Sequence, residues 1–168
     1  MRKLTAALIN RLKTSRRVAV LGVGSELRGD DAVGTVIARE VQAYTRFKKT
    51  KSVKVFLGQT APENLTGEIK KFKPTHLIII DAVDFNQRAG VAKIIDTGAE
   101  LGQSFSTHKM PIRIIRDYLY RAIGCQTIIL GIQPRSLDFS LVLTPGLLKR
   151  AKIISEEITG ALNKAFPK

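Results

Sequence analysis

The chain alternates between short, largely apolar runs and longer stretches in which apolar residues recur every three or four positions. The apolar runs are rich in Val, Ile and Leu, and they lie at residues 17–23, 53–57, 76–80, 90–95 and 126–132. Runs of this length, bounded by turn residues, indicate buried β-strands. We therefore expect a sheet of five strands, most of them covered on both faces.

The stretches between these runs have the period of an α-helix. Apolar residues on one face predict helices over residues 3–14, 30–48, 61–72, 111–123 and 145–165. The third of these helices stops before Pro74, Pro111 suits a first helical turn, and Gly124 follows a helix end. Strands that alternate with amphipathic helices favour an α/β fold in three layers around a mostly parallel sheet.

One connection differs from the others, because residues 81–95 hold no helix of useful length between two strands. A parallel return needs a crossover of about a dozen residues or more. We therefore predict that the strand at 90–95 runs antiparallel to its neighbour. The whole chain, residues 1–168, is expected to be a single α/β domain in which residues 1–14 add an N-terminal helix to a core at 17–165.

The length and charge of the chain narrow its possible functions. The 168 residues match one ordinary domain, and the formal net charge is +14. A clustered basic face would indicate nucleic-acid binding, but the basic residues are scattered, and the densest run, residues 48–54, carries no nucleic-acid motif. We expect no nucleic-acid partner. The excess charge instead favours the approach of an acidic protein partner.

Cysteine content and hydropathy indicate the cytoplasm. Cys125 is the single cysteine, which excludes an intramolecular disulfide, suits a reducing compartment and is typical of a small buried hydrophobe. The apolar stretch at the N-terminus is interrupted by Asn10, Arg11 and Lys13, and no window approaches the length of a membrane span. We expect a cytoplasmic protein without membrane insertion.

The turn after the first strand is rich in glycine and ends in two aspartates, Asp30 and Asp31. A dinucleotide-binding turn would need a glycine where Leu27 stands. Gly24 and Gly29 have the spacing of a phosphate-binding loop, but the two aspartates occupy the places of its lysine and hydroxyl residue, so the turn favours a cation. We expect Asp30 to cap the following helix and Asp31 to have a functional role.

Two further polar side chains fall beyond the same edge of the predicted sheet. Asp81 ends the third strand, and His108 lies just before the helix at 111–123. Because sites in open α/β sheets form beyond the carboxyl ends of the strands, we expect Asp31, Asp81 and His108 to converge there. Two carboxylates and one imidazole suit a first-row divalent ion and leave coordination positions open. Asp84 could support these metal ligands without binding the metal itself. His76 begins its strand at the opposite edge of the sheet, and we interpret it as structural.

The sequence offers little evidence for a catalytic serine or cysteine nucleophile. Ser106 lies near His108 in the sequence, but no Gly-x-Ser-x-Gly turn is present. Cys125 follows a helix end and has no evident base nearby.

Residues 22–34 resemble the Gly-x-Gly-Asn-x-Leu-x-x-Asp-[Asp/Glu]-x-x-Gly signature of the hydrogenase maturation proteases. Further segments resemble the branch that processes formate-hydrogenlyase-type hydrogenases, and they lie at residues 61–64, 74–84, 107–111 and 130–134. The likeness runs from about residue 17 to residue 160. Ser25 departs from the usual Asn, which we expect to alter a loop hydrogen bond. Leu57 and Gln59 stand where many relatives have Asp and Gly.

The resemblance implies a three-layer α/β/α sandwich around a five-stranded mixed sheet with one antiparallel strand. It implies a hydrolase grouped with the aspartic-type peptidases, which removes the C-terminal extension of a nickel–iron hydrogenase large-subunit precursor after nickel insertion. The family's metal-contacting positions fall on Asp31, Asp81 and His108, which we interpret as both catalytic and metal-contacting. Nickel would be supplied by the substrate, with no tightly bound cofactor of the protein's own, and the protease would act as a monomer.

Two alternatives stay open. The chain could be a hydrolase that carries its own divalent ion, which tight stoichiometric metal in the purified protein would favour. It could also be a non-catalytic protein that binds nickel or the precursor without cutting it.

Overall fold

The computed structural model describes residues 3–96 and 109–167. The strands are β1 (Val18–Val23), β2 (Val53–Gln59), β3 (His76–Ala82), β4 (Ala92–Ile95) and β5 (Gln126–Ile132). The helices are α1 (Lys3–Arg11), α2 (Val33–Phe47), α3 (Thr66–Phe72), α5 (Lys109–Ile123) and α6 (Pro145–Ala165), with short 3₁₀ helices η1 (Gly29–Ala32) and η2 (Pro62–Leu65). Each predicted strand and helix is present, with small displacements of its ends.

The strands form one mixed sheet in the order β2-β1-β3-β5-β4. The first four strands of that order run parallel, and β4 pairs antiparallel with β5. The antiparallel strand follows from the short connection after β3, which contains no crossover helix. The predicted fold class, a three-layer α/β/α sandwich with one antiparallel strand, is confirmed.

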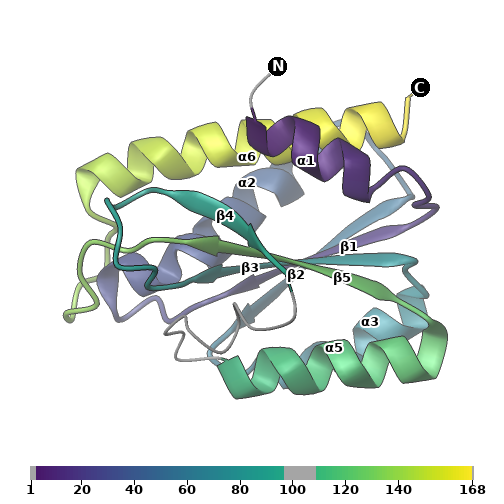
Figure 1. The fold of residues 1–168 in the computed structure, drawn as a ribbon, viewed down its shortest axis with the longest axis horizontal. Coiled ribbons are helices and arrows are strands. Elements are labelled where there is room, and N and C mark those ends of the chain that lie inside the picture. Colours follow the sequence, from purple (N-terminus) through teal and green to yellow (C-terminus); the bar gives the residue numbers. More distant parts are fainter. Residues whose placement is uncertain (1–2, 97–108, 168) are drawn as a thin grey trace.

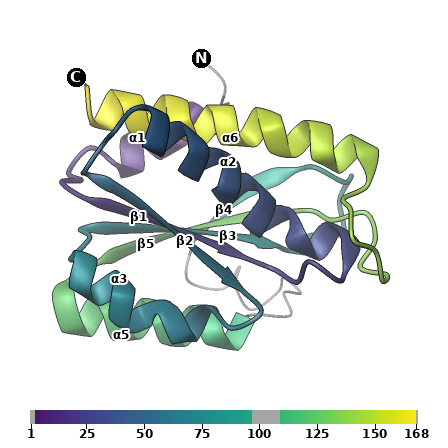
Figure 2. The same ribbon diagram turned by 180° about the vertical axis from the view of Figure 1, so that it is seen from behind.

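The helices cover both faces of the sheet, with α1, α2 and α6 on one face and α3 and α5 on the other (Figures 1 and 2). The side chains of β3 alternate between these layers. Ile78 and Ile80 belong to the core under α2 and α6, whereas Leu77 and Ile79 belong to the core under α3 and α5, and all four are 0% exposed. Burying each such side chain contributes about 1.5–3 kcal/mol relative to leaving it in water.

The N-terminal helix α1 is part of the larger core, because it packs along α6. Leu8 and the following Leu12 are buried in the same apolar cluster as Ile158 of α6. No helix in the described part of the chain is both long and apolar enough to cross a membrane.

Two helices begin differently from the prediction. The helix expected over residues 61–72 is divided into η2 and α3, and the helix expected from residue 30 begins at Val33, after η1. The second difference follows from the contacts of Asp30, whose carboxylate binds the segment between β5 and α6.

Candidate active site

The carboxyl ends of β1 and β3 lie side by side, because Gly22 of β1 is in register with Ile80 of β3. The turn that carries Asp31 and the strand end that carries Asp81 therefore leave the sheet at the same edge. η1, which contains Asp31, also contacts β3 directly. The sequence prediction that these two segments meet at one edge agrees with this arrangement.

Glycine at position 34 allows this close approach. A Cβ atom on Gly34 would lie 2.1 Å from the carbonyl oxygen of Ile80 and 2.4 Å from that of Val23. Gly24, with φ +133°, has no room either, because its Cβ would lie 1.7 Å from the carbonyl oxygen of Asp31. The first turn of α2 thus rests directly on the ends of two strands, and it fixes the backbone of Asp31.

Replacing Gly34 by Ala is therefore expected to destabilise the protein by about 2–4 kcal/mol, since backbone atoms must shift to admit the methyl group. Gly67→Ala is the matched control, because Gly67 is likewise the second residue of its helix and a Cβ there would meet nothing within 4 Å. That control should be neutral or gain up to about 1 kcal/mol. Urea unfolding measures both free energies, and equal effects of the two changes would contradict the close approach.

Asp31 lies in η1 with an exposed fraction of 2%. Its Oδ2 accepts a hydrogen bond of 2.8 Å from the backbone N–H of Ser25. Because the donor is a backbone N–H, this bond does not depend on which side chain is present at position 25. The Ser25 hydroxyl oxygen instead accepts a 3.3 Å bond from the backbone N–H of Leu27.

Asp81 lies near the carboxyl end of β3, opposite Gly131 of β5, with an exposed fraction of 0%. The alternation of side chains along β3 places it on the face of Leu77 and Ile79, which α3 and α5 cover. Asp31 and Asp81 are therefore both almost completely buried. A buried carboxylate is tolerated only where hydrogen-bond donors or a cation compensate its charge.

His108 lies outside the described residues, so its predicted role stays a prediction. In the sequence it directly precedes α5. The last residue of α5 lies at the amino edge of the sheet, where β5 begins with Gln126 paired to His76. Among residues 3–96 and 109–167, no three His, Cys, Asp or Glu side chains lie close enough together to hold a metal ion.

The prediction that Asp30 caps α2 is wrong. The N-cap of α2 is Ala32, and no side chain caps the helix. Asp30 is instead 0% exposed and binds the segment after β5. Its Oδ2 accepts bonds from the backbone N–H of Arg135 (2.8 Å) and Ser136 (3.3 Å) and from the Thr144 hydroxyl (3.0 Å), and its Oδ1 accepts one from the Thr144 backbone N–H (2.7 Å). Four donors compensate a buried charge better than one capping bond could.

The two neighbouring aspartates therefore have different environments. Asp30 joins the turn after β1 to the segment between β5 and α6, whereas Asp31 accepts a bond within its own turn. This division could not be predicted from the sequence, because the partners of Asp30 are mostly backbone amides.

Gln133 is a second residue whose role the sequence did not reveal. It is 6% exposed, and its Oε1 accepts bonds from the backbone N–H of Phe85 (2.6 Å) and Gln87 (3.2 Å). Its Nε2 donates to Asp84 Oδ1 (3.0 Å) and to the carbonyl of Pro134 (3.1 Å). The side chain thus ties together the segments that follow β3 and β5. Its place in the segment at 130–134 was the available signal.

Asp84 is exposed, and its described hydrogen bonds stay within this pair of loops. Its Oδ1 accepts a bond from the backbone N–H of Asn86 (2.8 Å) as well as from Gln133. These two bonds, that of Asn86 first, lower the pKa of Asp84. Asp84 therefore stabilises the loop after β3, and its proposed support of a metal shell stays a prediction.

Cys125 and His76 lie away from the candidate site, at the amino edge of the sheet. Cys125 precedes β5 and is 0% exposed, and burial raises the pKa of its thiol to about 12. His76 begins β3 with an exposed fraction of 2%, and burial lowers its pKa. The thiol is therefore protonated near neutral pH and unsuited to nucleophilic attack.

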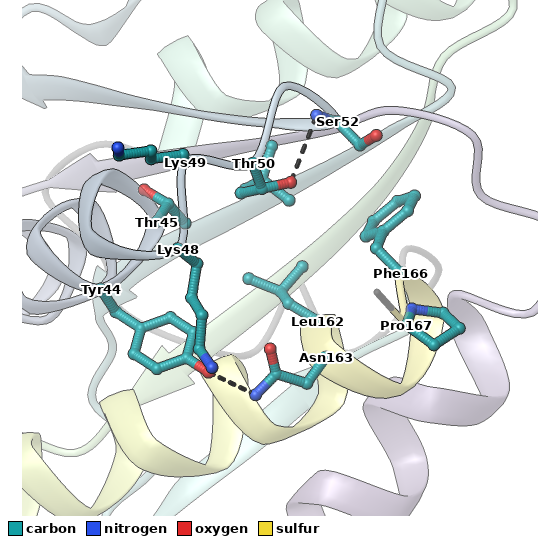
Figure 3. Close-up of a pocket in the computed structure, with 11 residues that line it drawn as sticks. Tyr44, Thr45, Lys48, Lys49, Thr50, Ser52, Leu162, Asn163, Phe166 and Pro167 are labelled. Carbon is teal, nitrogen blue, oxygen red and sulfur yellow. Dashed lines mark hydrogen bonds between the residues drawn. The ribbon is translucent and has the colours of Figure 1, made fainter.

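Figure 3 shows a hollow of about 480 Å³ lined by residues from three segments. It lies at the amino edge of the sheet, where Val53 of β2 pairs with Val18 of β1, and neither Asp31 nor Asp81 lines it. The end of α2, the turn before β2 and the end of α6 line it. The ammonium of Lys48 lies 5.8 Å from the ring centre of Tyr44, and Asn163 Nδ2 donates a 2.5 Å bond to the Tyr44 hydroxyl. Its described lining includes no carboxylate, imidazole or thiol, the side chains that most often bind a transition metal.

Comparisons with known proteins agree on one family. Residues 35–161 match the family model for hydrogenase maturation protease (HycI). A Methanocaldococcus jannaschii protein assigned to the hydrogenase maturation proteases is 35% identical over 152 residues, covering 88% of this chain and 90% of its own. The hydrogenase 3 maturation protease of Escherichia coli K12 is 32% identical over 143 residues, covering 84% and 88%.

A solved structure shows the same likeness. The crystal structure of a [NiFe] hydrogenase maturation protease, HycI, from Thermococcus kodakarensis has a TM-score of 0.81 and 28% identity, covering 94% of this chain and 99% of that one. The family match extends over most of the chain, and the fold is shared almost from end to end. The chain belongs to the hydrogenase maturation protease family.

Proposed function

We propose that the protein is an endopeptidase that removes the C-terminal extension of a nickel–iron hydrogenase large subunit after nickel insertion. The family supports the class of reaction, because a relative at 32% identity is a hydrogenase 3 maturation protease. The observation that carries the proposal is the pair of buried carboxylates, Asp31 and Asp81, on neighbouring elements at one edge of the sheet. The protein acts as a monomer in the cytoplasm.

In this proposal Asp31, Asp81 and His108 complete the coordination of a nickel ion that the substrate already holds. Two carboxylates in a buried place repel each other and gain from a cation between them. Oxygen and nitrogen ligands suit a divalent ion of borderline softness, which also accepts the thiolates of the substrate. Precursor without nickel would not supply this cation to the site, so in this proposal the metal acts as a checkpoint for cleavage.

Cleavage adds one water across the peptide bond and yields a new carboxyl terminus and a free amino terminus. The attack can be assisted by polarisation of the scissile carbonyl at nickel, or by Asp31 or Asp81 acting as the base that takes a proton from water. Both routes use the same residues, and both place the scissile bond beside the nickel ligands of the substrate.

The direct test is incubation of the purified protein with nickel-loaded precursor, followed by mass analysis of the precursor's C-terminus. We expect loss of the C-terminal extension in a single cut. Precursor that stays bound and uncut would favour the non-catalytic alternative. Metal analysis of the purified protein alone addresses the other alternative, because stoichiometric tight metal would indicate a hydrolase that carries its own ion.

A further inference from the structure

Four large apolar side chains are exposed to solvent beside the candidate active site. The exposed fractions are 80% for Phe139, 73% for Val142, 72% for Leu141 and 55% for Leu27. A single exposed apolar residue is ordinary, whereas a group of them marks an interaction site. We call these four residues the apolar rim.

The apolar rim is drawn together from two distant segments. The backbone N–H of Gly29 donates to the carbonyl of Ser140 (2.9 Å), and the N–H of Ser140 donates to the carbonyl of Leu27 (3.2 Å). Arg28 and Ser140 form a β-bridge between the same segments. Leu27 therefore lies next to the loop that presents Phe139, Leu141 and Val142.

The loop is held in place even though its apolar side chains are exposed. The Ser140 hydroxyl donates to the carbonyl of Val142 (2.9 Å), and the Ser136 hydroxyl donates to Asp138 (2.6 Å). Leu143, at 6% exposure, anchors the end of the loop in the core. A surface that is ordered before binding loses little conformational entropy when a partner arrives.

Asp30 fixes this loop relative to Asp31. Its buried carboxylate accepts bonds from Arg135, Ser136 and Thr144, on both sides of the apolar loop, and Asp31 is the next residue along the chain. A polypeptide seated on the apolar rim would therefore lie at a set position from the candidate site.

We propose that the apolar rim is the docking surface for an apolar segment of the hydrogenase precursor, flanked by acidic residues; this rests on the proposed function. The surface is continuous with the turn of Asp31, so its occupant is the chain being cut. Acidic flanks are inferred from Arg28 and Arg135, which are exposed and make no ion pair within the described residues. The neighbouring acid, Glu26, already pairs with Arg39.

The test compares a rim variant with a matched control in the processing assay. Phe139→Ser combined with Leu141→Ser removes two members of the rim. Phe47→Ser is the control, because Phe47 is 81% exposed but ends α2 at the opposite edge of the sheet. The rim variant should raise KM for the precursor about ten-fold or more with kcat nearly unchanged, because docking energy is common to the bound and transition states. The control should change neither constant.

Arg135→Glu tests the charge of the occupant. It should also raise KM, and the increase should shrink as salt is added. An unchanged KM for Arg135→Glu would show that no acidic residue of the precursor binds beside Arg135.

Other outcomes separate this inference from the proposed function. If the parent protein cuts the precursor and the rim variant does so with unchanged KM, the docking surface is refuted while the proposed function stands. If the parent protein cuts nothing, the proposed function fails, and direct binding of intact precursor to the parent and the rim variant then decides the docking surface: equal binding refutes it. Light scattering on the same samples tests whether the rim instead binds a second copy of this chain. Dimers that form as the concentration rises, and that only the rim variant loses while its KM stays unchanged, would assign the rim to self-association.

Discussion

The Asp31→Asn variant is expected to fold like the parent protein and to lose precursor processing by about 10²- to 10⁴-fold or more. Asn has nearly the same shape as Asp, and its carbonyl oxygen can still accept the 2.8 Å bond from the Ser25 backbone N–H. The negative charge is lost, and with it both the attraction for a cation and the capacity to take a proton. The site should therefore fail chemically while its structure persists.

The measurement is kcat/KM from the mass of the precursor's C-terminus, with thermal unfolding as the check on folding. Asp117→Asn is the matched control, because Asp117 is an exposed residue of α5 that pairs with Arg116 on the surface. That control should process precursor at the parent rate. Normal processing by Asp31→Asn would refute the assignment of Asp31.

Asp30→Ala is expected to lower the free energy of unfolding by about 3–5 kcal/mol. The change removes a buried acceptor and leaves the N–H groups of Arg135, Ser136 and Thr144 without their bonds. Because the same bonds hold the apolar rim, KM for the precursor should rise as well. The defect is thus a loss of positioning, unlike the loss of chemistry in Asp31→Asn.

Urea unfolding near neutral pH measures the loss of stability, and Asp138→Ala is the control in the same loop. Asp138 is exposed and its side chain accepts one bond, from the Ser136 hydroxyl, so its removal should cost about 1 kcal/mol or less. If Asp30→Ala cost no more than this control, the four bonds to Asp30 would not hold the loop to the turn after β1.

The sequence predicted the layers of the fold because local pattern determines them. The continuous apolar run from Leu77 to Ile80 fits a strand buried on both faces, and those residues are 0% exposed. The short connection before residues 92–95 predicted the antiparallel strand. The lateral order of the strands was not predicted, because it depends on pairings between segments far apart in the chain.

The roles of the two aspartates show where sequence reasoning ended. The common edge of Asp31 and Asp81 follows from parallel strands, but their depth of burial does not. The function of Asp30 escaped prediction because its partners lie 105 to 114 residues away, and most of them are backbone amides that carry no residue signature. Capping was the only local role available to it.

The apolar rim was equally invisible to pattern analysis. Phe139, Leu141 and Val142 are the kind of residues that normally indicate a strand or a core, yet the structure leaves them in water. Their exposure depends on the path of the loop, which is set in part by long-range backbone bonds between Ser140 and the turn after β1.

The proposed function depends on recognition by Asp31, Asp81 and His108 of nickel that the substrate already holds. Its most direct test gives the purified protein equal amounts of nickel-loaded and nickel-free precursor and measures the mass of each precursor's C-terminus over time. We predict that the loaded precursor loses its extension and the nickel-free precursor stays at full length. Equal cleavage of the two precursors would show that these residues do not recognise nickel in the substrate.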